Sequence, residues 1–268
     1  MRGLRRRGLR TGGSKGTDQL RLFAASSRRP APTRWPRTYW CTGRWHGAWC
    51  WKKVVPLFLE AGQRLYTPTL TRLGEKAHLL TPEVGLSTHI QDVVQLIEDN
   101  QLSDVILLGH SDSGMVITRV ADRLPERIGH QVYLDAVVPR DGESMADLAR
   151  LVIKRLRQEA RAHWDGWRVD PQREAPLGIG GLDGVTQEPD LSWVRANLCL
   201  QPLKTLEEPL HPKDPRSCRR KPARLFAAPA AALPWSSAMS CDTSWRAGRW
   251  PPPTPAGVCG SYQPVMTA

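Results

Sequence analysis

The amino-acid sequence predicts an α/β fold built on a mostly parallel sheet. Residues 104–108 (Asp-Val-Ile-Leu-Leu) and 131–136 (Gln-Val-Tyr-Leu-Asp-Ala) are short and largely apolar, as expected for strands that are buried on both faces. Residues 115–123 between them are typical of a helix. Strand, helix and strand at this spacing form the βαβ pattern of parallel sheets, and 268 residues suffice for one such domain with a small insertion.

The charge of the chain divides it into three parts. The formal net charge of +12 arises from +11 in residues 1–44, +6 in residues 211–268 and −5 in residues 45–210. A strongly basic protein often binds nucleic acid or a membrane surface. Here the middle of the chain is mildly acidic and no element repeats basic and aromatic residues. We therefore expect neither a nucleic-acid partner nor a membrane partner.

These composition breaks suggest the domain boundaries. We expect the folded core at residues 45–210, with a small helical cap at about 141–200. Residues 1–44 are rich in Arg, Gly, Ser and Pro and lack apolar periodicity. We interpret them as a basic extension that is non-native or disordered, with an organelle targeting peptide as the alternative. Residues 211–268 are interpreted as a poorly ordered tail.

Cysteine usage and hydrophobicity narrow the class of protein further. The six cysteines show no spacing typical of zinc ligands or of a disulfide framework. No apolar run reaches the ~18 residues of a transmembrane helix, and the basic start lacks the apolar stretch of a secretory signal. We expect a cytoplasmic protein without a bound metal.

Further elements are predicted around the βαβ unit. A short strand is expected at Arg64–Thr67, and the charged stretch Glu143–His163 is expected to form a helix of the cap. A helix is predicted from Thr88 to Gln101, with Ser87 or Thr88 as its N-cap. Its apolar face repeats at i, i+3, i+4 and i+7 and consists of Ile90, Val93, Val94 and Ile97.

The central motif is Gly-His-Ser-Asp-Ser-Gly at residues 109–114, between the first strand and its helix. This position is typical of a nucleophile elbow, G-x-S-x-G, with Ser113 in place of the last glycine. The turn strains the backbone of the nucleophile, so that its neighbours must be small, as Ser113 and Gly114 are. Ser111 is therefore the candidate nucleophile. The N–H of Asp112 would face the oxyanion, although its carboxylate would oppose negative charge there.

Segments on both sides of this motif carry a second set of patterns. They are Trp45–Trp51 (WHGAWCW), Tyr66–Thr71 (YTPTLT), Leu73–Glu75, His78–Leu79, Thr88–Val93 (THIQDV), Ala121–Arg123, Pro125–Ile128, Tyr133–Ala136, Val138–Gly142 and, more weakly, Gln201–Leu203 and Glu208–Leu210. Together these segments resemble the methylesterase and hydroxynitrile lyase branch of the α/β-hydrolases, including its small bacterial esterase-like members. The resemblance covers residues 45–210 and implies an α/β-hydrolase fold that is incomplete at both ends.

The resemblance implies hydrolysis of a small carboxylic ester without a cofactor. Ser111 would attack the acyl carbon, while the N–H of Asp112 and a loop N–H near Arg44 would hold the oxyanion. His46 and His110 are expected to line the pocket. A hydroxynitrile lyase-like enzyme is one alternative, and a catalytically inactive homologue that only binds a small ligand is the other.

The catalytic base is missing from its expected place. A serine nucleophile needs a base within hydrogen-bond reach, and the family supplies it as Gly-His-Asp after the last strand. The histidines after Ser111 are His130, His163 and His211, and each is interpreted as a surface or cap residue. Asp242 is the only acid near the expected position of the third triad residue.

A second reading frame would supply the missing motifs. The codons of Trp40–Arg44, read two bases later, can encode Val-His-Gly-Ala, which is the family's motif after its first strand. The codons around Gly257–Thr267 can encode Trp-Arg-Val-Arg-Glu-Leu-Pro-Ala-Gly-His-Asp, with the histidine codon across Val265 and Met266. We therefore hypothesise that both ends are frame-shifted and that the chain as written has little esterase activity.

Overall fold

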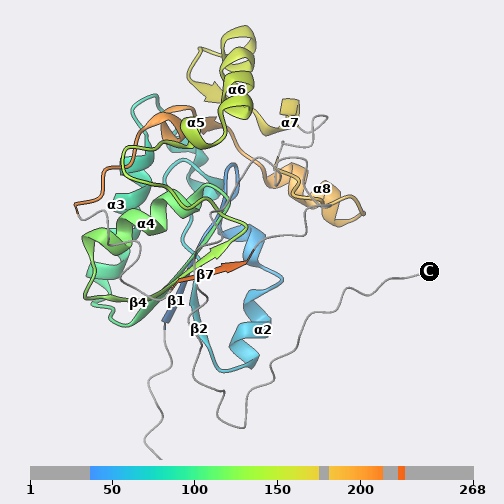
Figure 1. Cartoon of the computed structure of the whole chain (residues 1–268). Coiled ribbons are helices and arrows are strands. Elements are labelled where there is room, and N and C mark those ends of the chain that lie inside the picture. The colour runs from blue at the N-terminus through green and yellow to red at the C-terminus, as the bar shows by residue number, and fades with distance from the viewer. Residues whose placement is uncertain (1–36, 175–180, 214–222, 227–268) are drawn as a thin grey trace, which may run out of the picture. The chain divides into compact units, whose positions relative to one another are not determined.

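A parallel sheet of five strands forms the centre of the domain. The computed structural model describes residues 37–174, 181–213 and 223–226. Within these residues the strand order is β2-β1-β3-β4-β7, and each neighbouring pair is parallel (Figure 1). The strands are β1 (Arg37–Cys41), β2 (Arg64–Tyr66), β3 (Val105–His110), β4 (Ile128–Leu134) and β7 (Ala223–Phe226).

Side chains that alternate along β1 and β3 belong to two apolar clusters, one on each face of the sheet. Tyr39 and Leu107 are fully buried in the larger cluster, against the helices that follow β2 and β3. Trp40 and Leu108 belong to the smaller cluster, where the ring of Trp40 lies 4.7 Å from that of Phe58. The helices that cover the sheet are α2 (Val55–Glu60), α3 (Leu86–Asp99) and α4 (Ser113–Arg123).

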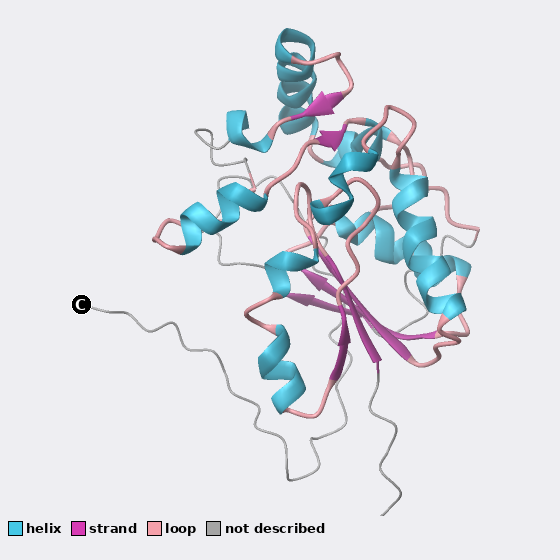
Figure 2. Ribbon diagram, turned by 180° about the vertical axis from the view of Figure 1, so that it is seen from behind, coloured by secondary structure: helices cyan, strands magenta, loops and turns pink. Residues whose placement is uncertain are grey.

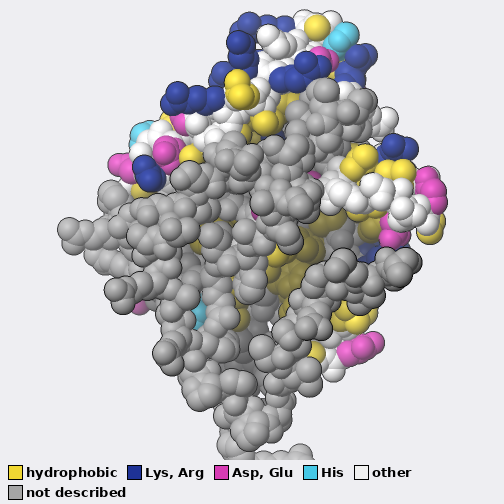
Figure 3. Space-filling view, turned by 45° about the vertical axis from the view of Figure 1, so that its right-hand side comes forward, with side chains coloured by type: hydrophobic (Ala, Val, Ile, Leu, Met, Phe, Trp, Pro, Cys, Tyr) yellow, Lys and Arg dark blue, Asp and Glu magenta, His cyan; other side chains and the backbone are white. Residues whose placement is uncertain are grey.

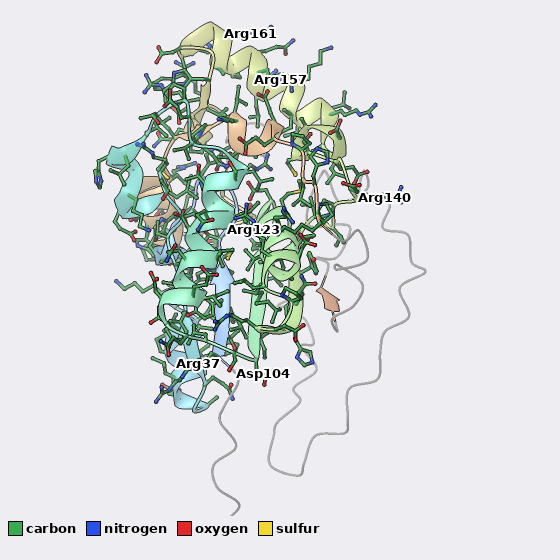
Figure 4. The ribbon with its side chains drawn as sticks, turned by 90° about the vertical axis from the view of Figure 1, so that its left-hand side faces the viewer. Arg37, Asp104, Arg123, Arg140, Arg157 and Arg161 are labelled. Atoms are coloured by element: carbon green, nitrogen blue, oxygen red, sulfur yellow. The ribbon has the colours of Figure 1, made fainter. Side chains whose placement is uncertain are left out.

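A helical cap lies beyond the ends of the strands, above the sheet in Figure 2. The single cap helix expected at 143–163 is two helices, because the chain turns at Ala149. Lysine and arginine side chains gather over the cap (Figure 3), and Arg157 and Arg161 extend from its long helix (Figure 4). The cap and its flanks contain α5 (Met145–Leu148), α6 (Arg150–His163), β5 (Arg168–Val169), α7 (Pro171–Glu174), α8 (Asp190–Asn197), β6 (Gln201–Pro202) and α9 (Lys204–Glu207).

Two short 3₁₀ helices, Ala48–Trp51 and Gly74–Leu79, complete the described elements. The prediction of the N-cap of α3 is wrong, since the helix begins at Leu86 after Gly85. The side chain of Thr88 instead reaches back and accepts a hydrogen bond of 3.4 Å from the Gly85 N–H. No helix among the described residues has the length and hydrophobicity needed to cross a membrane.

Both expected boundaries of the core are wrong where the structure describes the chain. Residues 37–44 were assigned to the basic extension, yet β1 pairs with β2 and β3, and Cys41 is fully buried. Aromatic and β-branched residues at 38–40 favour a strand, and this preference outweighs the composition of the segment before them. Residues 223–226 were assigned to the tail, yet they pair with β4. Apart from residues 211–213, the remainder of both tails lies outside the described residues.

Replacement of Tyr39 by alanine tests whether β1 belongs to the core. The Tyr39 ring is fully buried and stacks on Tyr66 at 4.6 Å, so we expect Tyr39→Ala to lower the free energy of unfolding by about 3 kcal/mol or more. The control Leu57→Ala, at a side chain that is 62% exposed, should change it by less than about 0.5 kcal/mol. Urea unfolding measures both changes in the free energy of unfolding. Equal effects of the two substitutions would contradict the assignment of residues 37–41 to the core.

Candidate active site

Ser111 lies in the tight turn between β3 and α4, as predicted. Its φ angle is +57°, in the left-handed region that residues with a side chain rarely adopt. Its carbonyl accepts a hydrogen bond of 3.0 Å from the N–H of Val137, beyond the end of β4. This strained conformation at a strand-to-helix turn is the geometry of a nucleophile elbow.

Glycines let three backbone segments approach this turn. A Cβ on Gly109 would lie 2.8 Å from the carbonyl oxygen of Ser113, and one on Gly114 would lie 1.9 Å from that of Val137. A Cβ on Gly43 would lie 2.9 Å from the Cβ of Ser111. All three distances are shorter than side chains tolerate, so the turn requires glycine at these positions.

The loop after β1 closes over the elbow from the other side. The hydroxyl of Ser113 donates a hydrogen bond to the carbonyl of Thr42, which ties the helix start to this loop. The N–H of Trp45 donates to the side-chain oxygen of Gln201 at 2.8 Å. The backbone of Arg44 runs between these two anchors, and its side chain is buried. The backbone N–H groups of Arg44 and Asp112, predicted to hold an oxyanion, therefore belong to two segments that meet at Ser111.

Two histidines, His46 and His110, lie beside this loop, but neither lines the small cavity next to the elbow. Nδ1 of His46 lies 2.6 Å from the carbonyl oxygen of Arg44, so that nitrogen carries the hydrogen, while Nε2 lies 3.8 Å from Asp183. The ring of His46 also stacks on Trp49 at 5.1 Å. Burial is the main cause of the lowered pKa of His110, which favours its neutral form.

Among the described residues, none makes a hydrogen bond with the hydroxyl of Ser111. His163 lies on α6 of the cap, 3.5 Å from Glu159, and His211 is exposed beside Asp141. His130 lies within β4. The interpretation of His163 and His211 as cap and surface residues is thus confirmed. Asp242 and the segment around Val265 lie outside the described residues.

Asp112 lines a small cavity beside the elbow, and the Oδ1 atom of its carboxyl group is inaccessible to solvent. Burial raises the pKa of this carboxyl group to about 6, although the positive charge of Arg44 and a hydrogen bond from Gln201 act in the opposite direction. Gln201 and Asp183 also belong to this region, although their sequence positions do not indicate it. Gln201 was quoted only within a weak motif, and no sequence pattern links either residue to Ser111, because the cap brings them there.

The described residues contain no group of three or more His, Cys, Asp or Glu side chains placed to hold a metal ion. Cys41, Cys50 and Cys199 are free thiols, and burial raises the pKa of Cys199 to about 11. The region therefore offers hydroxyl, backbone amide and imidazole groups, together with the carboxyl groups of Asp112 and Asp183 and the guanidinium of Arg44.

Comparison with known proteins gives the family. A model of the Alpha/beta hydrolase family matches residues 40–263. The chain belongs to the alpha/beta hydrolase family. Its parallel sheet, elbow and covering helices are the α/β-hydrolase fold expected from the sequence.

Relatives in this family include several esterases. The carbendazim hydrolyzing esterase of Nocardioides sp. (strain SG-4G) is 48% identical over 173 residues, which are 63% of this chain and 70% of that protein. Methylesterase 1 of Arabidopsis thaliana is 28% identical over 139 residues, and the match spans about half of its length (52%) and 51% of this chain.

Solved structures show the same fold. An extracellular alpha/beta-hydrolase from a Paenibacillus species, described as sharing structural and functional homology with tobacco salicylic acid binding protein 2, superimposes with a TM-score of 0.60 at 24% identity. The superposition covers 71% of this chain and 76% of that one. Methylesterase MES16 from Arabidopsis superimposes with a TM-score of 0.53 at 20% identity and covers 71% and 76% of the two chains.

Alanine at Gly114 tests the packing of the elbow. Its new methyl group would overlap the carbonyl of Val137, so we expect Gly114→Ala to destabilise the fold by about 3 kcal/mol or to prevent soluble expression. The control Ser113→Ala removes only the hydrogen bond to Thr42 and should cost about 1 kcal/mol. Denaturant unfolding compares the variants, and a Gly114→Ala protein as stable as Ser113→Ala would contradict this packing.

Proposed function

We propose that this chain is a serine hydrolase that acts on a small carboxylic ester, with Ser111 as its nucleophile. The observation that carries the proposal is the strained backbone of Ser111 at the junction of β3 and α4, with a hydroxyl that the described residues leave without a hydrogen bond. Membership of the α/β-hydrolase family and similarity to esterases support it.

The reaction would proceed through an acyl-enzyme. The hydroxyl oxygen of Ser111 attacks the ester carbonyl carbon and gives its proton to a general base. The carbonyl oxygen becomes an oxyanion that accepts hydrogen bonds from the backbone N–H groups of Asp112 and Arg44. The intermediate collapses, the alcohol leaves with the proton, and the acyl group stays on Ser111. Water then attacks the acyl-enzyme, which releases the carboxylic acid and restores the serine.

The general base that accepts the proton of Ser111 is the next part of the proposal. We retain the hypothesis that the codons around Val265 and Met266 encode the base in another frame. The corresponding hypothesis for Trp40–Arg44 has lost support, because Trp40 and Cys41 complete a buried strand in the present frame. The expected low activity of the chain as written therefore depends on its C-terminal part.

A ligand-binding homologue without catalysis is the second candidate function. The observation in its favour is that no described histidine hydrogen-bonds to Ser111. Such a protein would retain the elbow and the cavity beside Asp112 but would turn over no ester. The two candidate functions differ in one measurable quantity, which is the rate of ester hydrolysis that depends on Ser111.

The remaining parts of the proposal concern partners and location. A small-molecule ester would be the only partner, with no cofactor, no nucleic acid and no membrane surface. We also propose a cytoplasmic location, in keeping with the free thiols of Cys41, Cys50 and Cys199, since reducing compartments keep thiols free.

Hydrolysis of p-nitrophenyl acetate tests the proposal. We expect the chain as written to be slower than a version translated in the alternative C-terminal frame by about 10⁴–10⁶, the loss typical of a disrupted triad. In the restored version, Ser111→Ala should remove the activity. Release of p-nitrophenol, followed at constant enzyme concentration, gives both rates.

The matched control is Ser113→Ala, which alters the neighbouring hydroxyl but leaves Ser111 in place. It should keep the activity of the restored version within about tenfold, because it removes one neutral hydrogen bond. Equal rates for the two frames, both abolished by Ser111→Ala, would contradict the frame hypothesis and point to a histidine of the present chain. A restored version that is unaffected by Ser111→Ala would contradict the proposed nucleophile.

A further inference from the structure

The cap binds the backbone of Trp45 on both sides. The N–H of Trp45 donates a hydrogen bond of 2.8 Å to the side-chain oxygen of Gln201. The carbonyl oxygen of Trp45 accepts a hydrogen bond of 3.2 Å from the N–H of Cys199. Both partners belong to residues 199–201, which lead into β6, whereas Trp45 belongs to the loop after β1. The cap therefore fixes the two peptide groups that flank this residue.

Trp45 needs such a hold because its backbone is strained. Its φ angle is +65°, in the left-handed region that bulky residues rarely adopt. Its side chain is only 2% exposed, so this conformation occurs in the packed interior rather than in an exposed turn. A strained conformation persists only where the surrounding contacts impose it. The two hydrogen bonds from the cap are among these contacts.

The strained residue adjoins a group that the proposed function uses. The N–H of Arg44, one residue before Trp45, is one of the two proposed donors to the oxyanion. If Trp45 relaxed to a negative φ angle, the chain before it would turn and the N–H of Arg44 would point elsewhere. A displacement of about 1 Å in a catalytic group can cost about a hundredfold in rate. The hold on Trp45 therefore matters for the reaction.

Gln201 also reaches the second segment of the site. Its side-chain nitrogen donates over a long distance, 3.4 Å, to the carboxyl of Asp112, whose N–H is the other proposed donor to the oxyanion. The same nitrogen donates to the hydroxyl of Thr205 at 2.8 Å, and that hydroxyl donates to the carbonyl of Pro202 at 2.7 Å. Because the Thr205 hydroxyl has given its proton to Pro202, it accepts from the Gln201 amide. Thr205 thus fixes which end of that amide faces Trp45.

We propose that Gln201 is a positioning residue through which the cap holds the oxyanion loop, residues 42–46, in its reactive conformation. The inference rests on the proposed function, because that function assigns the oxyanion to the N–H groups of Arg44 and Asp112. Gln201 acts through the backbone of Trp45. Its loss should therefore slow the attack by Ser111 rather than weaken the binding of substrate.

Labelling of Ser111 by an alkyl fluorophosphonate tests this role without turnover. The hydroxyl oxygen of Ser111 bonds to phosphorus, fluoride leaves, and the solvent takes the hydroxyl proton. The phosphonyl oxygen then occupies the place of the oxyanion. Intact-mass spectrometry of the full chain at pH 8, at a series of reagent concentrations, gives the rate constant at saturation and the half-saturating concentration. The variant Ser111→Ala measures labelling at other residues.

Gln201→Leu should lower the saturating rate constant by about tenfold to a hundredfold and change the half-saturating concentration by less than about threefold. Outright removal of an oxyanion donor costs about 10²–10³, and a misdirected donor should cost less. The matched control is Gln131→Leu, because Gln131 is also buried and also donates from its side chain, to the carbonyl of Ile117 at 3.3 Å. It should leave both constants unchanged.

A second pair of variants decides the question if Gln201→Leu does not fold. Thr205→Val removes the hydroxyl that orients the Gln201 amide but keeps the shape of the side chain, whereas Thr205→Ser keeps the hydroxyl. The saturating rate constant should fall about threefold to tenfold in Thr205→Val and return in Thr205→Ser, as expected for one neutral hydrogen bond. Equal rate constants in the two variants would contradict the orienting role.

Hydrogen exchange of residues 42–46 measures the hold of the cap independently of Ser111. Loss of its acceptor should raise the exchange rate of the Trp45 N–H at least about tenfold in Gln201→Leu and leave it unchanged in Gln131→Leu. Unchanged exchange, or a higher half-saturating concentration with an unchanged saturating rate constant, would overturn the inference. Absence of labelling at Ser111 in every variant would contradict the proposed function. Labelling that depends on Ser111 but not on Gln201 would contradict only the inference.

Discussion

The close approach of three backbone segments at Ser111 is the constraint on which the rest of the site depends. At Gly43, Gly109 and Gly114 the backbone lies so near its neighbours that a methyl group would overlap them. This crowding holds Ser111 at φ +57°, a conformation that costs on the order of 1–3 kcal/mol for a residue with a side chain. The strain persists because the surrounding strands and α4 are fixed independently of it. The result is a hydroxyl presented at the end of a strand.

The sheet order explains why these segments meet. β1, β3 and β4 are neighbours and parallel, so that the loop with Thr42, the elbow and the segment with Val137 all leave the same edge of the sheet. Hydrogen bonds then join them: the Ser113 hydroxyl donates to Thr42, and the Val137 N–H donates to the Ser111 carbonyl. The cap adds Gln201, which binds the N–H of Trp45 and the carboxyl of Asp112. A different strand order would separate these three segments, and the site would not form.

Local patterns predicted the parts of this fold that depend on neighbouring residues. The elbow at 109–114, the helix after it and the strands on either side follow from short-range periodicity and turn chemistry, and they lie within a few residues of their expected positions. The strand β1 was missed because a basic, irregular sequence precedes it, whereas its pairing with β3 is a long-range contact. For the same reason the sequence gives no sign that Gln201 meets Asp112, 89 residues earlier. The catalytic base was expected within a sequence motif after the last strand. None of the described residues lies beside Ser111 as a base.

A crystal structure at about 2 Å resolution tests the backbone conformation of Ser111 most directly, because the electron density then defines the backbone torsion angles. We expect Ser111 at positive φ between β3 and α4, with Gly43 packed against Ser111 and Gly114 packed against Val137. Ser111 at negative φ within a continuous helix, or a loop after β1 that lies away from the elbow, would contradict this expectation.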